Sequence, residues 1–245
     1  MYKSKVLVGF ILSCYVFFVI FEINGNDVIA YNLNALIVPL IAVTYILFIK
    51  KKRRLFFLFL IFYSTADLLG LVISNLPITV SQKFNNYEYY IGNSLYILAY
   101  ALLVIKITKS LSFSHVIKNF KIHILVLSIL NVYLVYVLQV IINPNLILRS
   151  DYYLELAYNI VLVLLLTIAL LNYFYRDNKK SLYLFIGSIC IVFSEVIDVA
   201  YLYVTQRSLL NIIGTTLALG AFYFFYQQSK LFNKKNEEKN YMLFD

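Results

Sequence analysis

The sequence has 245 residues, of which 62% are hydrophobic and only 13% charged, and its mean hydropathy is +0.81. Soluble domains are roughly half apolar and a quarter charged, so this composition excludes an ordinary soluble domain and predicts an all-α polytopic membrane protein. The net charge of +9 does not indicate nucleic-acid binding, because the basic residues stand at the ends of apolar segments rather than along one face.

Eight apolar segments are long enough to cross the hydrocarbon core of a bilayer, which takes about 20 helical residues. The first follows two lysines but lacks a small-x-small cleavage site, so we interpret it as a retained helix rather than a signal peptide. The connections are short, so we expect residues 1–229 to form a single transmembrane domain, and residues 230–245 to form a flexible polar tail. The predicted spans are 6–23, 33–49, 55–75, 90–107, 121–142, 153–174, 182–204 and 209–229.

The basic residues indicate the orientation. All 21 Lys and Arg residues except Lys83, Arg149 and Arg207 lie before the first span, in alternate connections or in the tail. The positive-inside rule therefore predicts that both termini are cytoplasmic. The high usage of Ile, Asn, Lys and Tyr is typical of an AT-rich bacterial genome, and on that basis we predict a multi-pass protein of the bacterial inner membrane.

Two pairs of short segments are faintly alike. Residues 63–67 of the third span resemble residues 193–198 of the seventh, and residues 91–93 resemble residues 213–215. An ancestral four-plus-four duplication would produce these similarities, and so would chance.

Three carboxylates lie inside predicted spans: Asp67 in the third, and Glu195 and Asp198 in the seventh. An ionised carboxylate at the bilayer centre costs about 2.5–3.5 kcal/mol, so such groups usually face a cavity or one another. At about 1.5 Å per residue they lie roughly 18–24 Å from the cytoplasmic entry, in the outer half of the bilayer. Asp67 could instead accept hydrogen bonds from hydroxyls as a purely structural contact between helices.

Polar residues without charge lie at a similar depth, early in the helices that descend from the outer side. We predict that they share one polar cavity with the three carboxylates and bind the substrate there. These residues are Asn93, Ser94, Asn159 and Asn211.

Other kinds of site are not indicated. The chain has only two His and two Cys residues, which gives few ligands for a metal. It shows no phosphate-binding loop and no Ser-His-Asp set, so we predict a site without a metal or cofactor. Glu195 and Asp198 are three residues apart and share a helix face. Two close carboxylates in a medium of low dielectric do not both ionise readily, which favours general acid–base chemistry.

Four segments carry residues that partly match the sequence motifs of one membrane-protein family: 34–40, 63–67, 92–100 and 194–195. In these segments and in its eight spans, the chain resembles the YhhN-like membrane proteins, which include the lysoplasmalogenases. Ala66 stands where the family has Gly and Glu195 where it has Asp. The lysine of the family's second helix and the histidine of its fourth have no counterpart here.

This resemblance implies hydrolysis of the vinyl ether bond of a lysoplasmalogen or related single-chain lipid within the bilayer. Asp67 and Glu195 would be the acid–base pair, with Asp198 tuning Glu195. Two alternatives stay open: a proton- or cation-coupled transporter, which also keeps intramembrane carboxylates, and a catalytically inactive family member.

Overall fold

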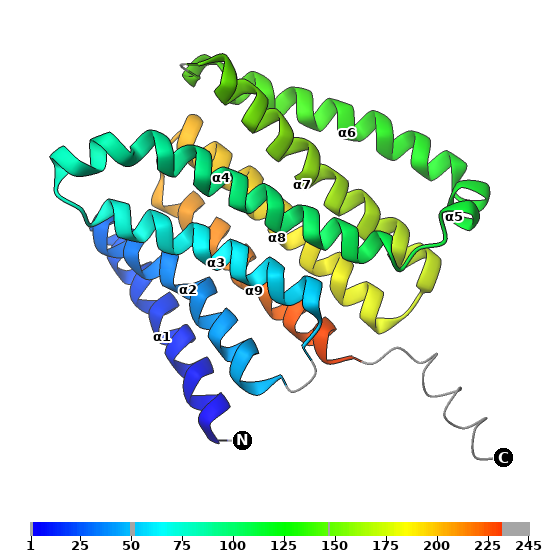
Figure 1. The fold of residues 1–245 in the computed structure, drawn as a ribbon, viewed down its shortest axis with the longest axis horizontal. Helices are drawn as coiled ribbons and strands as arrows, with labels where there is room; N and C mark the ends of the chain where they lie inside the picture. The colour runs from blue at the N-terminus through cyan, green and yellow to red at the C-terminus, as the bar shows by residue number, and fades with distance from the viewer. Residues whose placement is uncertain (1, 50–51, 147, 232–245) are drawn as a thin grey trace.

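The computed structural model describes residues 2–49, 52–146 and 148–231 (Figure 1). The tail predicted to be flexible falls, from residue 232 onward, outside these ranges. The described chain is all-α, with one short 3₁₀ helix, η1 (Asn143–Asn145). Its α-helices are α1 (Tyr2–Ile23), α2 (Asp27–Phe48), α3 (Arg54–Ser74), α4 (Ile78–Thr108), α5 (Phe113–Asn119), α6 (Lys121–Ile142), α7 (Arg149–Arg176), α8 (Lys179–Tyr203) and α9 (Ser208–Lys230).

Eight of the described helices, α1–α4 and α6–α9, are long and apolar enough to cross a membrane. The predicted eight-span architecture is therefore confirmed, and the chain is a multi-pass membrane protein by its helix composition. An even number of spans returns the chain to the side from which it started, and α1 begins and α9 ends at the same side of the bundle (Figure 1).

The structure differs from the predicted spans in two respects. It contains the additional helix α5, seven residues long, which is too short to carry a recognisable apolar period. It also begins α2 at Asp27 and α4 at Ile78, well before the apolar runs at 33 and 90. Polar residues occupy these added turns, so hydropathy alone places the helix starts too late.

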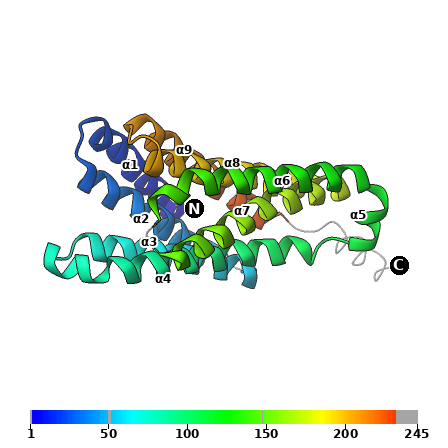
Figure 2. The ribbon, with the colours of Figure 1, turned by 90° about the horizontal axis from the view of Figure 1, so that it is seen from above.

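Six of the helices form a closed ring. In the order α2, α3, α4, α7, α8 and α9, each packs against the next, and α9 returns to α2. Seen from above, α3 and α4 lie in one layer and α8 and α9 in another, with α2 and α7 between them (Figure 2). The remaining long helices pack outside the ring, α1 on α2 and α6 on α7, at opposite edges of the molecule (Figure 1).

The two halves of the chain repeat the same packing order. In the first half α1 packs on α2, α2 on α3 and α3 on α4; in the second, α6 packs on α7, α7 on α8 and α8 on α9. The contacts between halves also correspond, because α4 meets α7 as α9 meets α2. The similar sequence segments fall on corresponding helices, α3 with α8 and α4 with α9. This is the arrangement that a four-plus-four duplication would produce.

Buried aromatic rings fill the ring of helices near the start of α3 and the end of α9. The ring of Phe59 lies 5.7 Å from that of Phe222 and 5.9 Å from that of Phe225. All three side chains are essentially inaccessible. Lipid tails are as apolar as these side chains, so helix association here depends on close van der Waals packing rather than on removal of apolar surface from water. We call these three residues the aromatic layer.

Candidate functional site

A cavity of about 470 Å³ lies within the ring of helices, and seven helices contribute residues to its wall. The predicted carboxylates Asp67 of α3 and Glu195 and Asp198 of α8 all line it. The side chains of all three carboxylates are partly exposed, because they face this open space. The structure thus brings together, across the ring, groups that are more than 120 residues apart in the sequence.

Asp67 is held by a tyrosine of the neighbouring helix. The Tyr96 hydroxyl of α4 donates a hydrogen bond to Oδ1 of Asp67 at 2.5 Å. Tyr63 lies one turn earlier on the same face of α3, and its ring centroid is 4.8 Å from that of Tyr96. The two aromatic rings thereby fix the side of the cavity from which Asp67 projects.

Glu195 accepts hydrogen bonds on both carboxylate oxygens. The Tyr158 hydroxyl of α7 donates to Oε2 at 2.6 Å, and the Tyr100 hydroxyl of α4 donates to Oε1. Tyr100 is fully buried and Tyr158 is 9% exposed. Glu195 therefore ties α8 to two other helices of the ring, and its orientation is set by groups outside its own helix.

Asp198 lies one turn beyond Glu195, against α9. A Cβ atom added at Gly214 would overlap the Asp198 carboxylate, so the glycine is what lets the carboxylate approach the α9 backbone. The Ser194 hydroxyl donates to the Gly214 carbonyl at 2.8 Å and holds the same two helices together. As the spacing predicted, Glu195 and Asp198 are close enough to interact electrostatically.

Two further carboxylates, missed from the sequence, line the cavity at the turn between α1 and α2. Glu22 is 2% exposed and has the Asn211 side chain of α9 within hydrogen-bonding reach. Asp27 begins α2 and follows Gly25-Asn26, a pair that is typical of a loop. One signal was present: Glu22 is the single charged residue in the apolar run 6–23.

The four predicted substrate-binding residues divide into two pairs. Asn93 and Asn211 line the cavity. Ser94 is exposed and Asn159 is 1% exposed, and neither is part of the wall. Successive residues of an α-helix point about 100° apart, so Asn93 faces the cavity while Ser94 faces away from it. For the same reason Tyr158 faces the cavity and its neighbour Asn159 does not. The amide nitrogen of Asn159 has no hydrogen-bond partner among the described residues.

The described residues that line the cavity include no Lys, Arg or His, and five tyrosines stand among the five carboxylates. Asp67 and Glu195 interact electrostatically across the space. Within the same described ranges, no three His, Cys, Asp or Glu side chains are placed to hold a metal ion together. The wall therefore offers carboxyl and phenol groups, which can transfer protons and attract positive charge. The tyrosines are Tyr31, Tyr63, Tyr96, Tyr158 and Tyr201.

A second hollow, of about 390 Å³, adjoins the cavity and shares Tyr31, Asn93 and Tyr96 with it. Its wall also includes Gly92 and Gly70, and the side chains of Tyr31 and Glu88 come close to the α3 backbone at Gly70. The two spaces together provide more volume than a small polar metabolite needs.

No protein-family model, curated protein or solved structure matches the chain. Membership of the YhhN-like family therefore stays a prediction from the sequence motifs, and the arrangement of the cavity is the basis for the function proposed below.

Proposed function

We propose that this protein is a membrane-embedded hydrolase that cleaves the vinyl ether bond of a lysoplasmalogen or a related single-chain lipid. One observation carries the proposal: carboxylates from two helices, Asp67 and Glu195, face a single cavity in which tyrosine hydroxyls hold them. No Lys, Arg or His lines that cavity among the described residues, so its acid–base chemistry would be that of carboxyl and phenol groups.

A vinyl ether is suited to such a pair. A carboxylic acid donates a proton to the vinyl carbon that is not bonded to oxygen, which leaves an oxocarbenium-like cation on the carbon that is bonded to oxygen. A carboxylate stabilises the cation and removes a proton from the water that attacks it. The resulting hemiacetal collapses to a fatty aldehyde and a glycerophospho alcohol. Glycosidases divide acid and base roles between two carboxyl groups in the same way.

The hydrogen bonds favour one assignment of these roles. Glu195 accepts from two hydroxyls and is suited to remain charged and to stabilise the cation. Asp67 accepts from one and is suited to deliver the proton. Asp198 would act on Glu195 through its charge rather than by touching the substrate.

The surroundings of the pair fit a single-chain lipid. Asn93 and Asn211 supply hydrogen-bonding groups at the wall for the head group, and the adjoining hollow between α3 and α4 offers space for further substrate atoms. We place the protein in the bacterial inner membrane, where such lipids would reach the cavity from the bilayer.

The test is aldehyde release from a lysoplasmalogen by the purified full chain in detergent. General acid–base catalysis contributes about 10²–10⁴-fold, so Asp67→Asn and Glu195→Gln should each lower the rate at least 100-fold. Glu155→Gln is the matched comparison, because Glu155 is also a buried carboxylate that accepts from a tyrosine, Tyr89 at 2.6 Å, but it does not line the cavity. Glu155 acts on Glu195 only through its charge, so this variant should change the rate far less than the other two.

Full activity of a folded Asp67→Asn or Glu195→Gln protein would exclude the assigned pair. No aldehyde release by the folded wild-type protein would exclude the hydrolase.

A second candidate, a cation-coupled or organic-cation transporter, is favoured by a separate observation. The described wall of the cavity carries five carboxylates and no basic residue, and tyrosine faces attract cations. Uptake into liposomes that depends on a proton or cation gradient, without aldehyde release, would establish this function instead.

A further inference from the structure

A small hollow lies at the opposite end of the ring from the acidic cavity. It is found where α4, α7 and α9 end and where α3 and α8 begin, and its volume is about 70 Å³. The positive-inside rule places this end at the cytoplasmic surface. The described residues of its wall include no carboxylate. Four basic residues, which together define the basic pocket, line it: Arg53, Lys106, Arg176 and Lys180.

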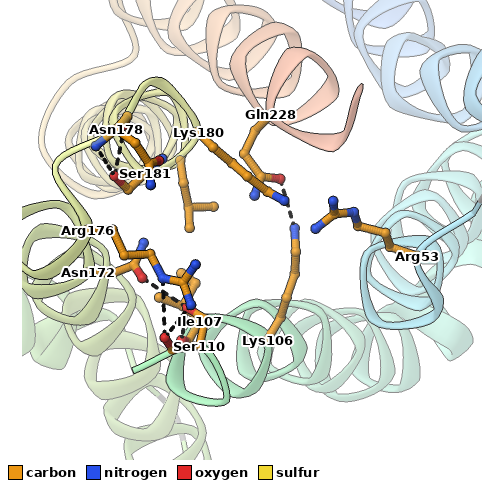
Figure 3. A pocket seen from close by; sticks show the side chains of 11 residues that line it. Arg53, Lys106, Ile107, Ser110, Asn172, Arg176, Asn178, Lys180, Ser181 and Gln228 are labelled. Atoms are coloured by element: carbon orange, nitrogen blue, oxygen red, sulfur yellow. Dashed lines mark hydrogen bonds between the residues drawn. The ribbon is translucent and has the colours of Figure 1, made fainter. Parts of the chain in front are cut away.

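These four charges converge instead of spreading apart. The ends of the Arg53, Lys106 and Lys180 side chains are turned toward one another, and Arg176 faces the same hollow from the other side (Figure 3). Lys106 is repelled by Arg53 and Lys180, and Lys180 by Arg53 and Arg176. Basic side chains at a membrane surface ordinarily extend into water, where their repulsion is weak. Topology therefore explains why the residues are basic but not why they point at one space.

Uncharged acceptors hold three of these side chains, those of Arg53, Lys106 and Arg176. Lys106 Nζ donates to Oε1 of Gln228 at 3.1 Å. Arg176 donates through Nε at 3.2 Å and Nη2 at 2.6 Å to the Ser110 carbonyl. Gln228 is only 4% exposed, so the frame around the ammonium group is well packed. The pocket thus has a fixed shape and a large positive charge.

We propose that the basic pocket binds a tetrahedral dianion of the phosphate class, either inorganic phosphate or the phosphomonoester head group of an inner-leaflet lipid. Two negative charges would offset the repulsion among Arg53, Lys106 and Arg176, which bond only to uncharged acceptors in the hydrogen bonds described above. Guanidinium groups bind phosphate oxygens in pairs, and lysine adds point charges. The hollow of about 70 Å³ has room for a small oxyanion. This site does not depend on the hydrolase proposal, because no described residue lines both the basic pocket and the acidic cavity.

The experiment measures two ligands on the purified full chain in a neutral detergent. One arm titrates inorganic phosphate by calorimetry. The other uses native mass spectrometry to compare retention of phosphatidic acid with that of phosphatidylcholine. Lys106→Gln and Arg176→Gln should each weaken phosphate binding, or retention of phosphatidic acid, at least tenfold. Lys179→Gln removes the same charge from an exposed neighbour outside the wall and should change neither by more than twofold.

A charge-preserving variant distinguishes loss of the charge from misfolding, because Lys106→Arg should retain binding and Lys106→Gln should lose it. Saturable phosphate binding without lipid retention would identify a soluble oxyanion as the ligand. Selective retention of phosphatidic acid that phosphate does not displace would identify the lipid head group. Binding of neither ligand, or an equal loss in Lys179→Gln and Lys106→Gln, would overturn the proposal.

Discussion

At the residue scale, the candidate site is built from carboxylates whose positions are set by tyrosines of other helices. Tyr158 and Tyr100 fix Glu195, and Tyr96 fixes Asp67. A hydroxyl of this kind adds an oriented donor without adding charge, and its removal leaves the carboxylate to water or to a new orientation. The tyrosines should therefore affect catalysis even if they do not touch the substrate.

Tyr158→Phe tests this relation, because it removes one of the two donors to Glu195 and keeps the ring. A hydrogen bond to a charged group is worth about 1.5–3 kcal/mol, and about 1.4 kcal/mol corresponds to a tenfold change in rate. We expect aldehyde release to fall at least tenfold. Tyr45→Phe is the control, since the buried Tyr45 hydroxyl accepts from the Arg53 backbone N–H at 3.1 Å, outside the cavity. Equal rates in the wild type and Tyr158→Phe would show that this donor is dispensable.

At the element scale, α8 and α9 make the most extensive contact among the described helices, and glycines permit it. A Cβ atom at Gly187 would lie 2.6 Å from the ring of Phe225, which is buried and cannot move aside. Gly214 has the same role beside Asp198. Two close approaches along one helix pair, one beside the aromatic layer and one beside the cavity, determine how these helices meet.

Gly187→Ala should therefore destabilise the protein although alanine favours helices. Overpacking of a well-packed interior costs about 1–3 kcal/mol, which exceeds the gain in helix propensity of about 1 kcal/mol or less. The fraction of monodisperse protein left after heating in detergent, measured by size-exclusion chromatography, should fall at a lower temperature than in the wild type. Gly9→Ala is the control, because nothing lies within 4 Å of a Cβ at that position, and it should be neutral or stabilising.

The elements themselves could be predicted from the sequence because bilayer thickness imposes a simple length requirement. The same requirement says nothing of helix rotation, which is why Ser94 and Asn159 were grouped with Asn93 and Asn211 although only the latter pair lines the cavity. The position of a residue along its span could be predicted, since it follows from the residue number. The direction in which a side chain points could not, because packing against neighbouring helices decides it.

At the scale of the whole molecule, the fold consists of two four-helix halves with the same packing order, joined by α5 and its flanking residues. Each half supplies part of the site, Asp67 from the first and Glu195 with Asp198 from the second. The sequence hinted at this repeat only through short segments that chance could also explain. The order of helix neighbours is stronger support, because it involves every long helix.

This organisation predicts that the chain can be divided between α4 and α5. Residues 1–111 and 112–245 each begin on the cytoplasmic side by the positive-inside rule and contain four spans. Co-expressed as separate chains, they should copurify through the α4–α7 and α2–α9 contacts and restore the activity of the intact protein. Each half expressed alone should be inactive and poorly retained. Failure of the two chains to associate would show that the covalent connection is needed for assembly.

The aromatic layer has a consequence for the energy balance of the cell. Polar hollows that enter a membrane protein from both sides could together conduct protons and dissipate the proton gradient across the membrane. Phe59, Phe222 and Phe225 have no group that can accept or release a proton, and their buried rings lie along α3 and α9 between residues that line the two hollows. For a hydrolase with this fold, these rings would favour the exchange of protons on the side of the acidic cavity, so turnover would not need to move protons across the membrane.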